Sequence, residues 1–424
     1  MTAPLVRPRL LPFLFLLVYF CNLCKIIASE TREREIRFPK PQSPYLSDAV
    51  VSRIAFGSCA NQSAPQPIWN AIIDFAPQLF IWLGDNIYGD NRRPLRFFGR
   101  EATVGPLKNT PRFFPSEESE MRRRYQLAKA QPGYSLLRKR AQVIGTWDDH
   151  DYGLNDAGKE FSEKNTSQRL LLDFLDEPED SARRRQAGVY ASYLFGPKGK
   201  QVKVVSNLSA STGPIFYVES WGHFPKERKR LYKLISDSER SGVFFISGDV
   251  HFAEITRYDC GCEYPLYDIT SSGLTQAVER TVPPPLDYLL RLAAWLTPTT
   301  MRVYSSTCQY KSCTYAKQNF GVIEIDWDTI PQSIKFEVRS VNGNSVNMVK
   351  FSLTELQPKK MNRIHKQEKY RQHCILEIEL PWFRRHQLAF AFFGTLAVYF
   401  VALIILVWII ASAGKTFVQK LKID

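Results

Sequence analysis

Acidic residues and histidines follow three apolar segments of the sequence, at the point where each segment ends. LFIWL runs into Asp85, VIGTW into Asp148, Asp149 and His150, and VFFIS into Asp249 and His251. A single aspartate after a strand is usually a turn or helix-capping residue, but three such ends indicate a shared site. Gathered carboxylates repel one another, and their pKa values rise unless cations neutralise them. The pattern therefore predicts a bound metal pair, with one carboxylate bridging two ions about 4 Å apart.

Two more residues could supply metal ligands of a different kind. Cys59 ends another apolar segment at FGSC, and Tyr88 lies three residues after Asp85. Taken alone, Cys59 would be a small buried hydrophobe or half of a disulfide, and Tyr88 a packed aromatic. Because a thiolate and a phenolate both need a strong Lewis acid near neutral pH, iron(III) beside calcium or magnesium is the favoured pair. Asp249 and His251 are two residues apart, so in a strand they would face the same side.

Short apolar strands that alternate with helices must position these residues. We expect strands at residues 50–59, 78–85, 141–149, 201–205, 242–251, 265–273, 321–327 and 333–341, the last two forming a hairpin. We expect helices at residues 67–75, 116–140 with a break at Pro132, 167–195 with a break at Pro178, and 226–240. The last helix should bury Leu231, Leu234 and Ile235, and residues 91–115 read as a surface excursion. The alternation predicts an α/β sandwich covered on both faces, with the strand ends meeting at one edge.

Two apolar segments at opposite ends of the chain predict its compartment. Residues 1–29 combine Arg7 and Arg9 with LLPFLFLLVYF and resemble a signal peptide, with an uncleaved anchor as the alternative. Residues 388–414 contain no charged side chain and exceed the roughly 20 residues that span a bilayer. We therefore expect a single-pass type I membrane protein with a lumenal domain at 48–350, a juxtamembrane linker at 351–387 and a cytoplasmic tail at 415–424.

Shorter patterns agree with a secretory-pathway membrane. Lys420 and Lys422 match a dilysine pattern that resembles an endoplasmic reticulum retrieval signal, which a receptor would read. Sequons for N-glycosylation occur at Asn61, Asn165 and Asn207. The segment at residues 279–298 is apolar and proline-rich, which suggests either a site near the membrane or packing on the membrane helix.

The cysteines are consistent with an oxidising lumen. Cys260 and Cys262 form one close pair and Cys308 and Cys313 another, and we expect bridges between the two pairs. Because Cys21 and Cys24 lie in the expected signal peptide, that arrangement would leave Cys59 and Cys374 unpaired.

The formal net charge of +14 suggests a polyanionic partner at first. The basic residues are scattered, however, and the acids at the strand ends would repel nucleic-acid phosphates in the absence of metal. We therefore expect no nucleic-acid recognition.

Four segments in order, FGSC, LGDNIYGD, TWDDHDYGLND and SGDVHFAEI, resemble the PhoD-like alkaline phosphatase family of the calcineurin-like metallophosphatase superfamily. The resemblance spans about residues 54–341. It implies a calcineurin-like sandwich of mixed sheets flanked by helices, and hydrolysis of phosphate monoesters or diesters at a binuclear or trinuclear metal site. The implied ligands, with Asp85 bridging, are Cys59, Asp85, Tyr88, Asp149 or Asn155, Asp249 and His251. His150, which would contact the phosphate or protonate the leaving oxygen, and Asp148 are the predicted catalytic residues.

The chain departs from the family pattern after Val205. Family members continue from this strand into an Asp-x-Arg loop, a helix and another strand, whereas here QVKVV runs directly into SNLSASTGP. A crossover of this kind takes roughly 30 residues or more, so its loss predicts unpaired strand edges. The alternative function is therefore a catalytically impaired, truncated family member that acts as a non-enzymatic membrane glycoprotein.

Overall fold

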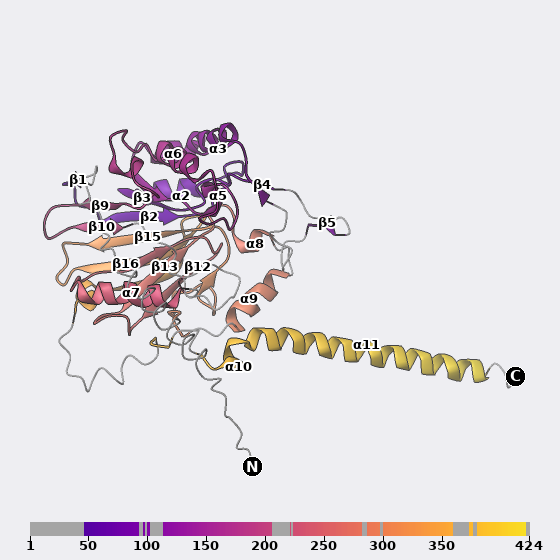
Figure 1. Cartoon of the computed structure of the whole chain (residues 1–424). Helices are drawn as coiled ribbons and strands as arrows, with labels where there is room; N and C mark the ends of the chain where they lie inside the picture. Colours follow the sequence, from indigo (N-terminus) through magenta and orange to yellow (C-terminus); the bar gives the residue numbers. More distant parts are fainter. Residues whose placement is uncertain are drawn as a thin grey trace, which may run out of the picture. The chain divides into compact units, whose positions relative to one another are not determined.

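The computed structural model describes residues 46–92, 96–97, 100–101, 113–205, 221, 224–281, 286–296, 300–358, 373–375 and 380–420 (Figure 1). The expected signal peptide, the sequon at Asn207 and Lys422 of the dilysine pattern lie outside the described residues.

The larger of the two main sheets contains six strands. They are β2 (Arg53–Gly57), β3 (Leu79–Leu83), β8 (Gln142–Thr146), β15 (Asn319–Asp326), β16 (Ser333–Ser340) and β17 (Ser345–Ser352), in the order β17-β16-β15-β2-β3-β8. β2, β3 and β8 run parallel, whereas β15, β16 and β17 pair antiparallel. The expected hairpin of β15 and β16 is confirmed.

The second main sheet has the order β11-β13-β12-β14. Its strands are β11 (Phe245–Ser247), β12 (Ala253–Tyr258), β13 (Leu266–Ser271) and β14 (Thr314–Tyr315). A third sheet joins β1 (Leu46–Ser47), β9 (Ser192–Phe195) and β10 (Val202–Val205). In the described chain β10 and β11 each end their sheet, so these two strands flank the position where the sequence predicts a missing crossover.

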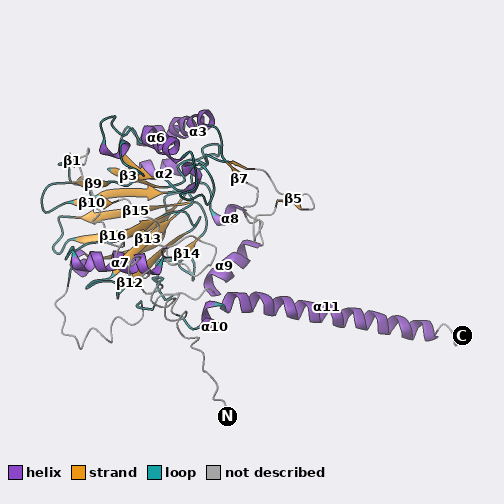
Figure 2. Cartoon of the chain, in the orientation of Figure 1, coloured by secondary structure: helices purple, strands orange, loops and turns teal. Residues whose placement is uncertain are grey.

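The core has two parts, one on each face of the six-stranded sheet. Between the two main sheets lie side chains from both, such as Phe56 and Phe336 from one and Ile255 and Ile269 from the other. The opposite face is covered by helices α2 (Ile68–Phe75), α3 (Glu118–Ala130), α4 (Pro132–Leu137) and α6 (Lys164–Phe174) (Figure 2). The result is a mixed α/β fold, as the sequence predicts.

An aromatic cluster holds the helices to the sheet. Trp69 of α2 lies 5.5 Å from Trp82 of β3 and 5.1 Å from Tyr134 of α4, measured between ring centroids. The indole of Trp82 donates a hydrogen bond to the Tyr134 hydroxyl at 3.0 Å. Gly133 lets the chain pass here, because a Cβ at this residue would lie 2.3 Å from Trp69 Cβ. This packing fixes the parallel strands that lead to the site.

Two helix predictions need correction. Residues 182–184 form a short 3-10 helix and residues 192–195 form strand β9, so the expected helix at 167–195 ends with α6. In β9 every second side chain, Tyr193 and Phe195, is buried, as in a strand. An alternation over four residues is too short to distinguish a strand from the end of a helix in the sequence. In α7 (Pro225–Asp237) Ile235 is buried as expected, but Leu234 is 65% exposed.

The excursion expected at residues 91–115 contains short strand pairs where it is described. β4 (Asn91–Arg92) pairs with β7 (Phe113–Phe114), and β5 (Arg96–Phe97) pairs with β6 (Arg100–Glu101).

The predicted disulfide pairing is wrong. Cys260 bonds to Cys374, and Cys308 bonds to Cys313, which leaves Cys59 and Cys262 as the free cysteines among the described residues. Spacing alone cannot decide connectivity. The long-range bond ties the segment before the C-terminal helices to the end of β12.

Two helices, α10 (Trp382–Arg385) and α11 (Gln387–Lys420), end the described chain. Within α11, residues Ala389–Ser412 are long and apolar enough to cross a membrane, which is weak evidence for a membrane span.

Candidate metal centre

Two glycines let the loop after β3 approach the loop after β8, and the loop after β11 approach the loop after β2. A Cβ at Gly84 would lie 2.5 Å from Asp148 Cβ, and one at Gly248 would lie 2.6 Å from Ser58 Oγ. Larger residues would push these loops apart, since a Cβ atom essentially never lies within 3 Å of a non-bonded heavy atom. The acids at the strand ends therefore reach one another because glycine precedes two of them.

Hydrogen bonds connect these loops to the loops that follow β2 and β13. Ala60 N donates to Asp85 O at 3.0 Å, and Asp249 N donates to Ser58 Oγ at 3.2 Å. His251 N donates to Ser272 Oγ at 3.0 Å. Side chains from both main sheets are thereby held at one edge.

Four predicted ligands have left-handed backbone conformations. The φ angles are 62° for Cys59, 47° for Asp85, 69° for Asp249 and 61° for His251. A non-glycine residue in this region costs on the order of 1 kcal/mol or more and is concentrated at functional sites. Asp249 and His251 lie beyond the end of β11, so the expectation that they share one side of a strand is wrong.

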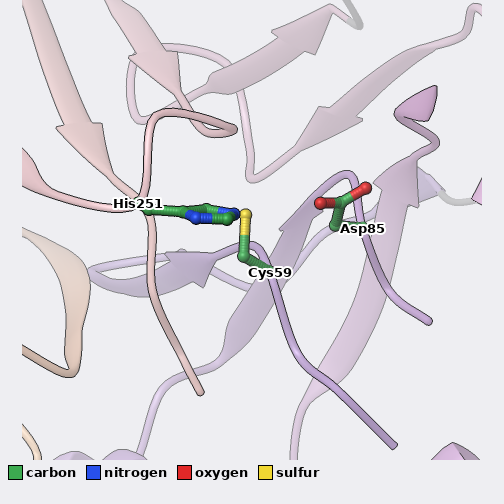
Figure 3. Close-up of side chains that lie close together, drawn as sticks. All are labelled: Cys59, Asp85 and His251. Atoms are coloured by element: carbon green, nitrogen blue, oxygen red, sulfur yellow. The ribbon is translucent and has the colours of Figure 1, made fainter. Parts of the chain in front are cut away.

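The first group of possible ligands joins Cys59, Asp85 and His251 (Figure 3). One donor atom from each residue lies within 4.8 Å of the others. The sulfur, the carboxylate and the imidazole edge point toward one another, with His251 arriving from the four-stranded sheet's side. The Tyr88 hydroxyl lies 3.3 Å from His251 Nε2, so the structure places this predicted ligand beside the group.

The second group joins Asp85, Asp149 and His150, again with donor atoms within 4.8 Å of one another. Asp149 and His150 open the short helix α5 (Asp149–Tyr152). Asp85 belongs to both groups, which is the arrangement that a bridging carboxylate requires.

The electrostatics of the centre strongly favour a cation. Burial, followed by the charges of Asp149 and Asp148, raises the pKa of Asp85 well above its usual range. Burial and the charge of Asp85 likewise raise the pKa of the Cys59 thiol, and burial raises that of the Tyr88 phenol. Asp85 Oδ1 is buried without a hydrogen-bond partner. An unpaired buried carboxylate oxygen among other acids is costly unless a cation binds it.

His150 has a partner that the sequence reasoning missed. Its Nδ1 lies 2.8 Å from Asp90 Oδ1, and the backbone N–H of Asn155 donates to Asp90 Oδ2 at 3.0 Å. Burial lowers the pKa of His150, but the hydrogen bond to Asp90 and the charge of Asp149 outweigh burial and raise it. Asp90 closes the LGDNIYGD segment, and only the return of that loop toward α5 reveals its role.

Arg124 of α3 holds the loop that carries Tyr88 and Asp90. Its guanidinium donates to Tyr88 O at 3.0 Å, to Asp90 O at 2.6 Å and to Asn91 Oδ1 at 2.7 Å. Glu120, one turn earlier on α3, accepts from Arg124 Nε at 2.8 Å. This network positions the loop without reaching the ligand atoms.

The remaining predicted residues lie around the centre. Asp148 is the N-cap of α5 and forms a reciprocal capping box with Asp151. Asp249 belongs to neither group of the described residues, although its backbone carbonyl accepts from Cys59 Sγ at 3.6 Å and its charge contributes to the raised pKa of Cys59. Asn155 is brought to Asp90 through its backbone. Their side-chain roles stay predictions.

The chain matches a protein family and is similar to a solved structure. Residues 54–203 match the PhoD-like phosphatase family, a stretch that includes Cys59, Asp85 and Asp149 but ends before Asp249 and His251. A solved structure described as "Structure of PhoD" is 12% identical, covers 76% of this chain and 73% of its own, and superimposes with a TM-score of 0.42. No curated protein matches the chain.

Proposed function

We propose that the chain is a metal-dependent hydrolase of phosphate monoesters or diesters, because residues 54–203 match the PhoD-like phosphatase family. The observation that carries the proposal is the shared use of Asp85 by two clusters of possible metal ligands. We further infer that the two packed sheets form a calcineurin-like sandwich, because the ligands come from loops of both sheets.

The residues at the centre fit a binuclear metal site. Cys59, His251 and Tyr88 would hold one ion, Asp149 the other, and Asp85 would bridge them. The unpartnered Oδ1 of Asp85 supports this assignment, and Asp249 and Asn155 are the candidates to complete the two ligand sets. A thiolate and a phenolate favour iron(III) at the first position, and the carboxylates favour calcium or magnesium at the second. Bound ions would supply Lewis acidity at the phosphate.

We infer that His150 holds or protonates an oxygen of the substrate. Asp90 accepts a hydrogen bond from Nδ1, so the proton is fixed on that nitrogen and Nε2 remains for the substrate. The raised pKa increases the protonated fraction near neutral pH, which suits an acid that delivers a proton to the leaving oxygen. The Tyr88 ring lies 4.3 Å from the imidazole between ring centroids, tilted by 40°, and limits the rotation of the imidazole.

We propose that the catalytic domain is tethered to a secretory-pathway membrane. Helix α11 supports a single span, and the Cys260–Cys374 disulfide supports an oxidising compartment. The lumenal orientation and retrieval through Lys420 and Lys422 rest on the sequence patterns.

Metal content and turnover of the full chain in detergent test the proposal. We expect stoichiometric metal and hydrolysis of chromogenic phosphate monoesters or diesters, with both lost in Asp85→Asn. Asp328→Asn is a matched control, because the Asp328 side chain is 90% exposed and pairs only at the surface with Lys200. Folded protein without metal or turnover would contradict the proposal.

The competing candidate is the catalytically impaired, truncated family member. The position of β10 and β11 at the ends of their sheets favours it, because a crossover between them would occupy those edges. Activity that appears only after a crossover segment is restored after Val205 would support this candidate.

A further inference from the structure

Helix α9 (Leu286–Leu296) carries a row of exposed apolar side chains. Tyr288, Leu292 and Trp295 are 65%, 48% and 59% exposed. Their spacing of four and three residues puts all three on one face of the helix. Contiguous exposed apolar side chains usually mark a surface that contacts a partner or a membrane.

The end of α9 is linked to the segment that leads into the candidate membrane helix. Thr300, just beyond α9, accepts a hydrogen bond at its carbonyl from His373 Nδ1 at 2.8 Å, and its hydroxyl donates to Ile375 O. Cys374, which lies between His373 and Ile375 in the sequence, forms a disulfide with Cys260. These hydrogen bonds and the disulfide form a clamp at residues 373–375. From this clamp the chain continues to α10 and then to α11. Because only a short stretch of chain separates the clamp from α11, the exposed face of α9 stays close to the candidate membrane span.

The residues around both helices suit the boundary between lipid and water. Trp382 and Phe383, just before α11, are exposed, and tryptophan favours the headgroup region of bilayers. Arg291 lies beside the apolar face of α9, 5.4 Å from the Tyr288 ring, and pairs with Glu279 at 3.2 Å. An apolar row with Trp, flanked by a cation, is typical of helices that lie in a membrane interface.

We propose that α9 is a membrane-contact helix, and that Tyr288, Leu292 and Trp295 enter the interfacial region of the bilayer that α11 spans. This inference rests on the membrane tether in the proposed function. A lipid surface is the favoured partner of α9. Because the clamp at Cys374 tethers α9 close to the bilayer, its contact with lipid is an intramolecular step, and a small apolar face is enough to bind.

The contact would also orient the metal centre. Helix α8 (Val278–Thr281) precedes α9 in the chain, and its Val278 N–H donates to His251 O at 3.0 Å. A bilayer that holds α9 would therefore hold the His251 side of the centre at a fixed orientation to the membrane. Phosphate esters carried by lipids would reach such a site more readily than soluble ones.

Fluorescence quenching in reconstituted vesicles tests the contact. The full chain is inserted into phosphatidylcholine vesicles with or without bromine on the lipid chains near the headgroups, and compared with Trp295→Phe. We expect the substitution to remove a lipid-quenched component on the order of one of the chain's 8 tryptophans. Leu292→Ser should weaken the quenching of Trp295, whereas Leu234→Ser on α7, where the leucine is 65% exposed against 48% for Leu292, should leave it unchanged.

The competing environments of Trp295 give different results. A component quenched by aqueous acrylamide and not by brominated lipid would show that α9 faces water and would overturn the proposal. A component quenched by neither reagent would show that protein covers α9, which also overturns it. The readout requires no catalysis, so an inactive chain leaves the result intact, and quenching of Trp408 in α11 reports separately whether the tether inserts.

Discussion

Replacement of Asp85 by asparagine should stabilise the metal-free protein while it abolishes metal binding. Asp85 is 1% exposed, its Oδ1 has no hydrogen-bond partner, and its carboxylate lies within 4.8 Å of that of Asp149. With an effective dielectric constant of about 20, two charges at that separation repel by about 3 kcal/mol. The asparagine side chain has the same shape without the charge, so the metal-free variant should gain about 2–3 kcal/mol in its free energy of unfolding.

The measurement is urea unfolding of the full chain in detergent, in alkaline buffer, with either chelator or added metal. Alkaline buffer matters because the raised pKa of Asp85 lets a proton relieve the repulsion at lower pH. In chelator we expect the variant to unfold at higher urea than the wild type. With metal the order should reverse, because binding stabilises only the wild type. Asp328→Asn controls for loss of a surface charge, and an Asp85→Asn variant that is less stable than wild type in chelator would refute the reasoning.

Three further outcomes are expected. Asp90→Asn should lower turnover about a hundredfold or more with little change in metal content, because His150 loses the acceptor that fixes its proton; an unchanged pH profile of the residual activity would contradict this. Burial raises the pKa of Asp268 to about 7 from 3.8, so the folded state binds more protons between these values and stability should fall by up to about 4 kcal/mol as pH rises through them; Asp268→Asn should flatten that dependence in unfolding titrations. Cys374→Ser removes the disulfide that closes a loop of 114 residues and should lower the free energy of unfolding by about 5 kcal/mol, against about 2 kcal/mol for loss of the Cys308–Cys313 disulfide. Equal losses of stability in thermal unfolding would count against the loop-entropy explanation.

The sequence predicts those residues of the candidate centre whose side-chain type and position after a strand indicate a metal ligand. Asp85, Asp149 and His150 follow neighbouring parallel strands of the six-stranded sheet, which bring their loops to one edge, whereas His251 follows an apolar strand of the second main sheet. Asp90 could not be found this way, because its contact with His150 depends on how the loop after Asp85 turns back. No periodicity records that path.

The misassignments have similar physical origins. The left-handed backbone at Asp249 and His251 depends on contacts with the loops after β2 and β13, which a local pattern does not contain. The partner of Cys260 is more than a hundred residues away, so its choice is made by the folded domain and not by cysteine spacing. Leu234 lies at a helical spacing that suggests burial, yet it is exposed, whereas Ile235 is buried and Leu231 packs against the same core.

The ligands of the first group come from two sheets that are otherwise joined by side-chain packing and loop contacts. Cys59 and Asp85 follow strands of the six-stranded sheet, whereas His251 follows β11 of the other. An ion bound by all three is a cross-link across the sandwich, and separating the sheets then requires its coordination bonds to break. The metal supply of the compartment would thereby set the lifetime of the folded protein against unfolding and proteolysis as well as its activity.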